Sequence, residues 1–135
     1  MVLLDQIKDL EKRLLALYHH LKIEAKIGFV ESEELKTQQD DFWHDSKRAE
    51  AIMRAIKKTK NWIQQYHDVK QALEDLVILN EFFLEKEVSS DEIEDNFNKT
   101  KCLLENLEFK NMLSNNEDHM PAILTINPGA ALDGL

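Results

Sequence analysis

The most restrictive feature of this sequence is how rarely glycine and proline occur in it. Gly28 is the only glycine before Gly129, and no proline precedes Pro121. A chain rich in β-strands needs a glycine or proline turn about every ten residues, so residues 1–120 are predicted to be helical. The chain has 135 residues, which is the size of one ordinary domain.

The first predicted helix covers residues 2–27. Its apolar residues recur every three or four positions, which places them on one face of a helix. Leu4, Leu15 and Tyr18 widen this stripe beyond a two-helix seam, as is typical of a bundle. Gly28 follows two lysines and is predicted to end the helix. The stripe consists of Leu3, Ile7, Leu10, Leu14, Leu17 and Leu21.

The next segment, residues 29–44, is predicted to be a joint that contains a short helical stretch. Phe42 and Trp43 lie in it between acidic and polar residues. Large aromatic side chains are most often part of a core, so we expect both to be buried, together with Trp62 and Tyr66. The alternative is that these aromatics mark a binding hot spot.

A long helix is predicted from Ser46 to about Glu87, with Asp45 as its N-cap. About 42 residues at about 1.5 Å each span roughly 63 Å. This length exceeds a compact domain of this size, so the helix either kinks or projects as an arm. Its stripe is predicted to contain Ile52, Ile56, Thr59, Ile63, Tyr66, Lys70, Leu73, Val77, Asn80 and Leu84, with Val69, Leu76 and Phe83 as substitutes where the stripe drifts.

The last predicted helix begins near Ser89, which forms a capping-box pattern with Glu92, and Ser90 is the alternative cap. It is predicted to run to Leu113, where the polar residues 114–118 follow. Its stripe contains Ile93, Phe97, Leu104, Leu107 and Asn111.

Residues 119–135 differ in character from the helical domain, 1–118. Residues 122–126 are a β-prone run after Pro121, and residues 127–129 are a turn signal. One strand cannot form a sheet alone, so we expect this strand to begin a further domain whose remainder is absent. The predicted fold class is all-α: an antiparallel helical bundle or coiled-coil-like arm with one long central helix and a short strand-like tail.

Composition excludes several classes of protein. The formal net charge of −9 argues against wrapping nucleic acid as the main task. The single cysteine, Cys102, rules out a disulfide framework and a cysteine-based zinc site. No apolar run approaches the roughly 20 residues of a membrane span. We therefore expect a cytoplasmic protein without a membrane partner.

No pattern of catalytic or metal-binding residues is found. The five histidines show no ligand spacing, and His19 and His20 are adjacent, so a helix points them about 100° apart. Cys102 has no neighbouring base, and carboxylates such as Asp91 and Glu92 lie on a solvated face. We expect no metal, no cofactor and no small-molecule substrate, and a small helical enzyme is disfavoured.

Charge is unevenly distributed along the predicted long helix. Residues 44–70 hold seven Lys or Arg against three Asp or Glu, whereas residues 71–98 hold one against nine. Arg54, Lys57 and Lys58 share one helical face. Two interpretations stay open: a solvated face, or a contact with RNA or an acidic protein surface. The candidate contact residues are Lys47, Arg48, Arg54, Lys57, Lys58 and Lys60.

Four short motifs follow one another along the chain. They are Asp-Phe-Trp-His-Asp-Ser-Lys-Arg-Ala-Glu at 41–50, Leu-Glu-Asp-Leu at 73–76, Leu-Glu-Phe-Lys-Asn-Met-Leu at 107–113, and Ile-Leu-Thr-Ile-Asn-Pro-Gly-Ala at 123–130. In this order and spacing they resemble the N-terminal domain of the bacterial peptide chain release factor family. The tryptophan and the motif at 107–113 favour the type 2 branch of that family.

The resemblance implies a function in translation termination. Release factors of this family direct hydrolysis of peptidyl-tRNA at stop codons. Their N-terminal domain is a helical arm near the ribosomal stalk base and the GTPase-associated region, and it is implicated in work with the recycling GTPase. By resemblance, this chain is a monomeric docking arm with the ribosome as its partner.

Two departures from the family limit what the resemblance implies. The Gly-Gly-Gln motif of peptidyl-tRNA hydrolysis and the Ser-Pro-Phe tripeptide of stop-codon reading are missing, and residues 131–135 do not follow the family pattern. We therefore expect no enzymatic activity from this polypeptide. The alternative is a stand-alone coiled-coil adaptor, which would dimerise in parallel through the stripe from Ile52 to Leu84.

Overall fold

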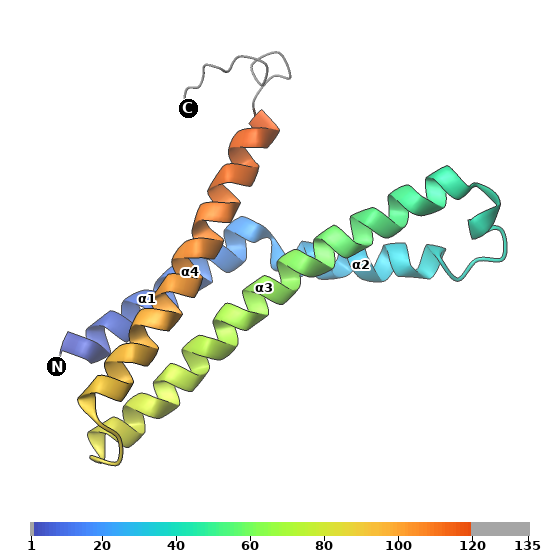
Figure 1. Ribbon diagram of the computed structural model, residues 1–135. Helices are drawn as coiled ribbons and strands as arrows, with labels where there is room; N and C mark the ends of the chain where they lie inside the picture. The colour runs from blue at the N-terminus through green and yellow to red at the C-terminus, as the bar shows by residue number, and fades with distance from the viewer. Residues whose placement is uncertain (1, 120–135) are drawn as a thin grey trace.

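The computed structural model describes residues 2–119, and its regular structure there is entirely helical (Figure 1). The all-α class is therefore confirmed for this part of the chain. The predicted strand 122–126 and the tail lie outside the described residues. The elements are α1 (Val2–Leu21), α2 (Ile23–Lys36), the short 3₁₀ helix η1 (Phe42–His44), α3 (Ser46–Leu84) and α4 (Ser90–His119).

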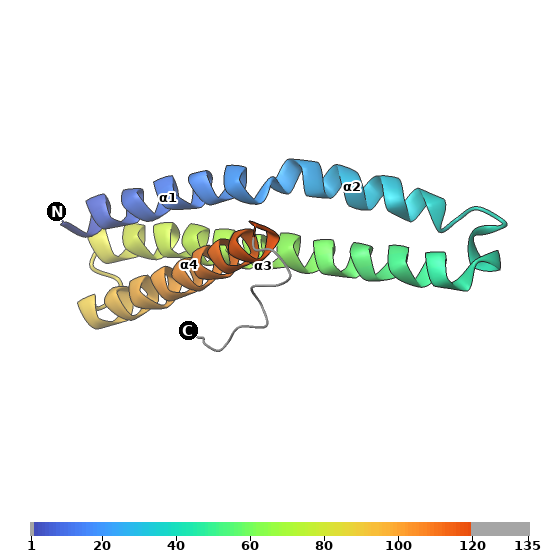
Figure 2. The same ribbon diagram turned by 90° about the horizontal axis from the view of Figure 1, so that it is seen from above.

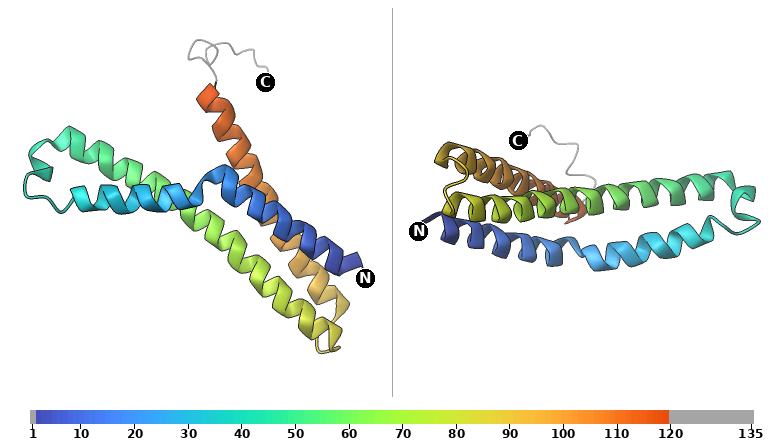
Figure 3. Two further views of the ribbon diagram at one scale, coloured as in Figure 1. Left: turned by 180° about the vertical axis from the view of Figure 1, so that it is seen from behind. Right: turned by 90° about the horizontal axis from the view of Figure 1, so that it is seen from below.

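Helices α1 and α2 follow each other along one side of α3 and run in the opposite direction (Figure 2). Helix α4 lies along the C-terminal half of α3 and also contacts α1. We call α1, α4 and this half of α3 the three-helix part. Helix α2, η1 and the N-terminal half of α3 form the two-helix arm, which α4 does not cover (Figure 3).

The main core lies inside the three-helix part. The predicted stripes of the first and last helices are confirmed there, apart from half-buried Leu3 and Asn111. Each fully buried aliphatic or Phe side chain contributes about 1.5–3 kcal/mol relative to exposure. The core residues are Ile7, Leu10, Leu14, Leu17, Leu21 and Ile23 from α1 and α2, Tyr66, Val69, Leu73 and Leu76 from α3, and Ile93, Phe97, Leu104 and Leu107 from α4.

The stripe of the long helix drifts, as a straight helix requires. Val69 and Leu76 are buried, whereas Lys70 and Leu84 are exposed. The wider stripe predicted for the first helix is wrong at Leu4 and Leu15, which face solvent at 44% and 59% exposure. Helices α3 and α4 cover only one side of α1, so a broader apolar face finds no neighbour there.

The prediction that Gly28 ends the first helix is wrong. Helix α1 ends at Leu21, Lys22 has a left-handed φ of 54°, and Gly28 lies inside α2. In a straight helix, the side chains of residues 21 and 23 would point to nearly opposite sides. The break at Lys22 lets Leu21 and Ile23 both be buried, and the Lys26 ammonium donates to the Leu21 carbonyl.

Helix α3 runs for 39 residues, about 58 Å, and its N-terminal half projects in the arm. The Asp45 carboxylate accepts a hydrogen bond from the Arg48 backbone N–H at 3.1 Å, which confirms the predicted N-cap. At the other end, the N–H groups of Lys86 and Glu87 donate to Phe83 and Phe82, both at 2.9 Å. This is a Schellman motif, and Lys86 has a φ of 65°.

Helix α4 begins where predicted and ends later than predicted. The Ser89 hydroxyl accepts from the Glu92 N–H at 3.1 Å, so Ser89 is the cap. The predicted end at Leu113 is wrong, because the helix continues through residues 114–118 to His119. No glycine or proline lies in this stretch, and polar residues lower helix propensity only weakly.

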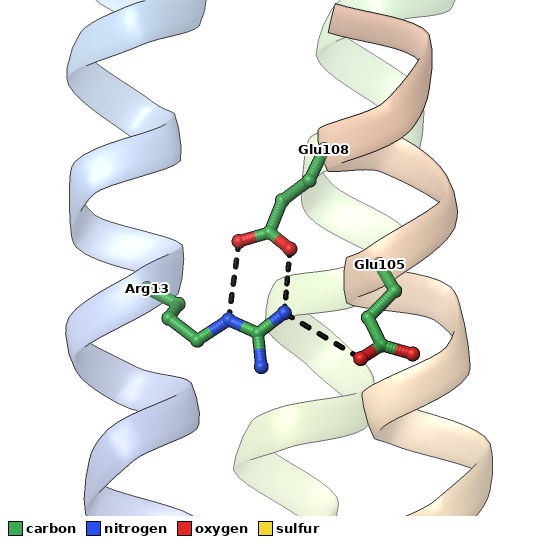
Figure 4. A network of polar contacts seen from close by, with 3 residues as sticks. All are labelled: Arg13, Glu105 and Glu108. Atoms are coloured by element: carbon green, nitrogen blue, oxygen red, sulfur yellow. Dashed lines mark hydrogen bonds and ion pairs between the residues drawn. The ribbon is translucent and has the colours of Figure 1, made fainter. Parts of the chain in front are cut away.

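Polar contacts join α4 to both neighbours. Arg13 of α1 donates to both carboxylate oxygens of Glu108, at 3.2 and 2.6 Å, and lies 3.7 Å from Glu105 (Figure 4). Lys110 donates to the Gln65 side chain of α3 at 2.8 Å. A bidentate Arg–carboxylate pair fixes direction as well as distance, so it sets the register of α4 on α1.

Candidate functional site

The basic residues of the long helix gather on the two-helix arm. Arg54, Lys57, Lys58 and Lys60 line a shallow hollow with Asn61 and Gln64. The buried residues of this part of α3, Ala49 and Ile56, lie roughly a third of a turn around the helix from the middle of the hollow. The hollow therefore lies beside the contact between α2 and α3, and Lys60 at its edge reaches Glu34 of α2.

Three of these cations are free to meet a partner. Within residues 2–119, no ion pair joins Arg54, Lys57 or Lys58 to a carboxylate, and all three are exposed. Lys60 instead pairs with Glu34 of α2 at 2.5 Å and so joins the two helices of the arm. Unpaired cations that line one hollow attract anionic surfaces and release counterions when they bind them.

The structure divides the predicted group of six. Lys47 and Arg48 are exposed in the first turn of α3 and do not line the hollow. The Arg48 backbone serves the N-cap of this helix. The hollow therefore contains four of the six predicted residues, and the other two lie near the tip of the arm.

Sequence reasoning missed two residues of the hollow, Asn61 and Gln64. They follow Lys57 by four and seven positions, so they lie on its face of the helix. This spacing would have predicted both residues, but they were not among the candidates because their side chains carry no charge. Their amide groups add hydrogen-bond donors beside the cations.

Trp43 is not part of the core, so that prediction is wrong. Its side chain is 61% exposed, whereas Phe42 is 1% exposed. Adjacent residues of a 3₁₀ turn point to different sides, and only Phe42 faces inward. The expectation holds for buried Tyr66 and in part for Trp62, which is half-buried and packs against the core.

Among the residues that the structure describes, three groups have a shifted pKa, and none of them lines the hollow. Burial raises the pKa of Tyr66, and Tyr18 and Glu74 add to the effect. Burial lowers the pKa of Lys26, with repulsion from Lys22 as the second cause. The hydrogen bond that Arg13 donates to the Glu108 carboxylate raises the pKa of Arg13. These shifts mark helix packing and interhelical contacts.

Other chemical groups are dispersed. Cys102 is an exposed free thiol, and its sulfur accepts a hydrogen bond from the Asn106 side-chain amide at 3.8 Å. In the part of the chain that the structure describes, no group of three His, Cys, Asp or Glu residues is placed to hold a metal ion. No helix among residues 2–119 is both long and apolar enough to cross a membrane.

The arm is helical and carries a cationic hollow and an exposed tryptophan. A family model described as the PCRF domain matches residues 28–131 of this chain. The chain therefore belongs to the PCRF domain family. No solved structure shows a significant match to it.

Curated relatives of this chain include several proteins named peptide chain release factor 2. The one from Campylobacter concisus is 34% identical over 111 residues, which are 80% of this chain and 29% of the relative. The one from Nautilia profundicola is 30% identical over 131 residues, 93% of this chain and 35% of the relative. The Yersinia pseudotuberculosis protein is 29% identical over 133 residues, with the same coverage. The chain spans about a third of the length of these relatives.

Proposed function

We propose that this chain is the N-terminal docking domain of a translation termination factor, a peptide chain release factor that acts at stop codons on the ribosome. The observation that carries this proposal is the PCRF match over residues 28–131, together with several curated relatives named peptide chain release factor 2. Residues 1–118 form the docking domain, and residues 119–135 begin the central domain of the longer factor.

The docking surface is the cationic hollow on the arm. Its partner is the ribosome at the stalk base and GTPase-associated region, with the recycling GTPase as a second partner. Two features support a docking role: α4 leaves the arm uncovered, and Arg54, Lys57 and Lys58 have no carboxylate partner among the described residues. Complementary charge speeds encounter and sets orientation.

The chemistry of termination lies elsewhere in the longer factor. The 135 residues contain neither a Gly-Gly-Gln nor a Ser-Pro-Phe sequence. This polypeptide therefore binds without promoting release of the peptide. Its location is the cytoplasm, where bacterial translation takes place.

The domain acts as a monomeric antiparallel bundle with a projecting arm. A parallel coiled-coil adaptor would need the stripe from Ile52 to Leu84 for a second copy. Ile56, Tyr66 and Leu73 of this stripe are already buried within the single chain. Light scattering at micromolar concentration should give the mass of one chain, and a clean dimer would favour the adaptor.

Co-sedimentation with bacterial 70S ribosomes tests the docking surface. The double variant Arg54→Glu/Lys57→Glu should bind about tenfold or more weakly, and the salt dependence of binding should become less steep. The matched control is Lys99→Glu/Lys101→Glu, which changes net charge equally on exposed positions of α4. Equal affinity of the two double variants at every salt concentration would remove the hollow from the docking surface.

A further inference from the structure

Trp43 is an exposed aromatic side chain held in a fixed position. Its ring meets that of Phe42 edge to face, with centroids 4.8 Å apart and planes at 90°. Phe42 is almost fully buried and anchors the pair. The turn is closed by backbone hydrogen bonds from Phe42 to Gln39 and from His44 to Asp41, both 3.1 Å. Trp43 therefore loses little conformational freedom when a partner covers it.

Trp43 lies at the far tip of the arm. The 3₁₀ helix η1 joins α2 to α3 at the end remote from α4, as the views in Figures 1 and 3 agree. At 61% exposure, Trp43 presents a large apolar surface that contributes little to folding. Leu35, in the last turn of α2, is also exposed, at 65%. Tryptophan is enriched among the residues that dominate binding energies.

We propose that Trp43 anchors the arm by inserting into an apolar pocket on a protein component of its docking site. This inference rests on the proposed function and names one contact of that docking. The arm then binds through two regions of different chemistry. The tip supplies an apolar anchor, and the cationic hollow supplies electrostatic attraction.

Local charge favours a protein pocket over an RNA base as the partner of Trp43. Stacking on an unpaired base would bring the phosphate backbone close to the tip. Carboxylates outnumber the Lys and Arg residues there by four to three, which disfavours a nearby phosphate backbone. Residues 36–50 contain the carboxylates Asp40, Asp41, Asp45 and Glu50 against the cations Lys36, Lys47 and Arg48.

The test compares Trp43→Ala and Trp43→Phe in binding to 70S ribosomes and to protein-free ribosomal RNA. Trp43→Ala should weaken ribosome binding about 30-fold or more, and Trp43→Phe should retain part of the affinity. The salt dependence should not change, because no ion contact is lost. Leu103→Ala on α4, 42% exposed, is the matched apolar control and should bind as wild type. Thermal unfolding midpoints should stay close to wild type in all three variants.

Two outcomes overturn the inference alone. One is unchanged ribosome binding by Trp43→Ala. The other is an equal loss on protein-free ribosomal RNA, which would indicate stacking on a base. Failure of the wild-type chain to bind ribosomes would contradict the proposed function and this inference with it.

Discussion

Lys22 and Lys86 adopt positive φ angles of 54° and 65°, a region that favours glycine. Both lysines end a helix, so each turn is enforced by packing and hydrogen bonds against the preference of the residue. Gly28 lies in a regular helix, so the conformational freedom of glycine is not needed there. The turn at Lys22 allows Leu21 and Ile23 both to be buried, and the turn at Lys86 is closed by the hydrogen bonds of the Schellman motif.

Lys86→Gly should stabilise the chain by about 1 kcal/mol, because glycine pays no penalty for a Cβ in the left-handed region. Urea unfolding followed by circular dichroism measures the change. Glu85→Gly is the control: its φ is −88°, so glycine relieves no strain and should not stabilise. A Lys86→Gly chain no more stable than wild type would mean that the Schellman turn carries no strain.

Gly28→Ala should also raise the free energy of unfolding, by about 0.5–1 kcal/mol, since alanine is the better helix former. A Cβ at Gly28 would meet no atom within 4 Å, so there is no opposing clash. The reverse change at an exposed helical site, Ala51→Gly, should lower stability by a similar amount. A loss of stability in Gly28→Ala would show that the backbone at residue 28 is not helical.

At the scale of elements, apolar periodicity predicts α1 and α4 well because their buried residues recur at the helical period. The caps at Asp45 and Ser89 are also readable, since each depends on residues three positions apart. The exposure of Trp43 depends on how α2 packs against α3, and this packing cannot be predicted from a local sequence pattern. The pair between Lys60 and Glu34 likewise joins residues of different helices. Sequence therefore predicts the basic face but not which of its cations are free.

Two neighbouring leucines of α4 test the packing of this helix. Leu104 is 1% exposed and Leu103 is 42% exposed. Leu104→Ala should lower the free energy of unfolding by about 2–5 kcal/mol through lost burial and a cavity. Leu103→Ala should cost well under half as much. Equal effects in chemical denaturation would contradict the orientation of α4 on the core.

At the scale of the whole molecule, the three-helix part contains most of the core, and the arm presents the candidate binding residues. The three-helix part holds most of the buried apolar side chains and the Arg13–Glu108 contact. The arm holds few, chiefly Val30, Phe42, Ala49 and Ile56, and presents the cationic hollow and Trp43. A stable base and an uncovered arm that presents this cationic hollow support the proposed docking on an anionic surface, despite a net charge of −9.

The most direct test of the docking account is competition in an in vitro termination reaction with full-length peptide chain release factor 2. Ribosomes paused at a stop codon receive this chain in excess, then the full-length factor, and peptide release is timed. We expect slower release, because the chain occupies the docking site, and no release when the chain is added alone. Unchanged release at any excess of the chain, or stop-codon-dependent release by the chain itself, would contradict it.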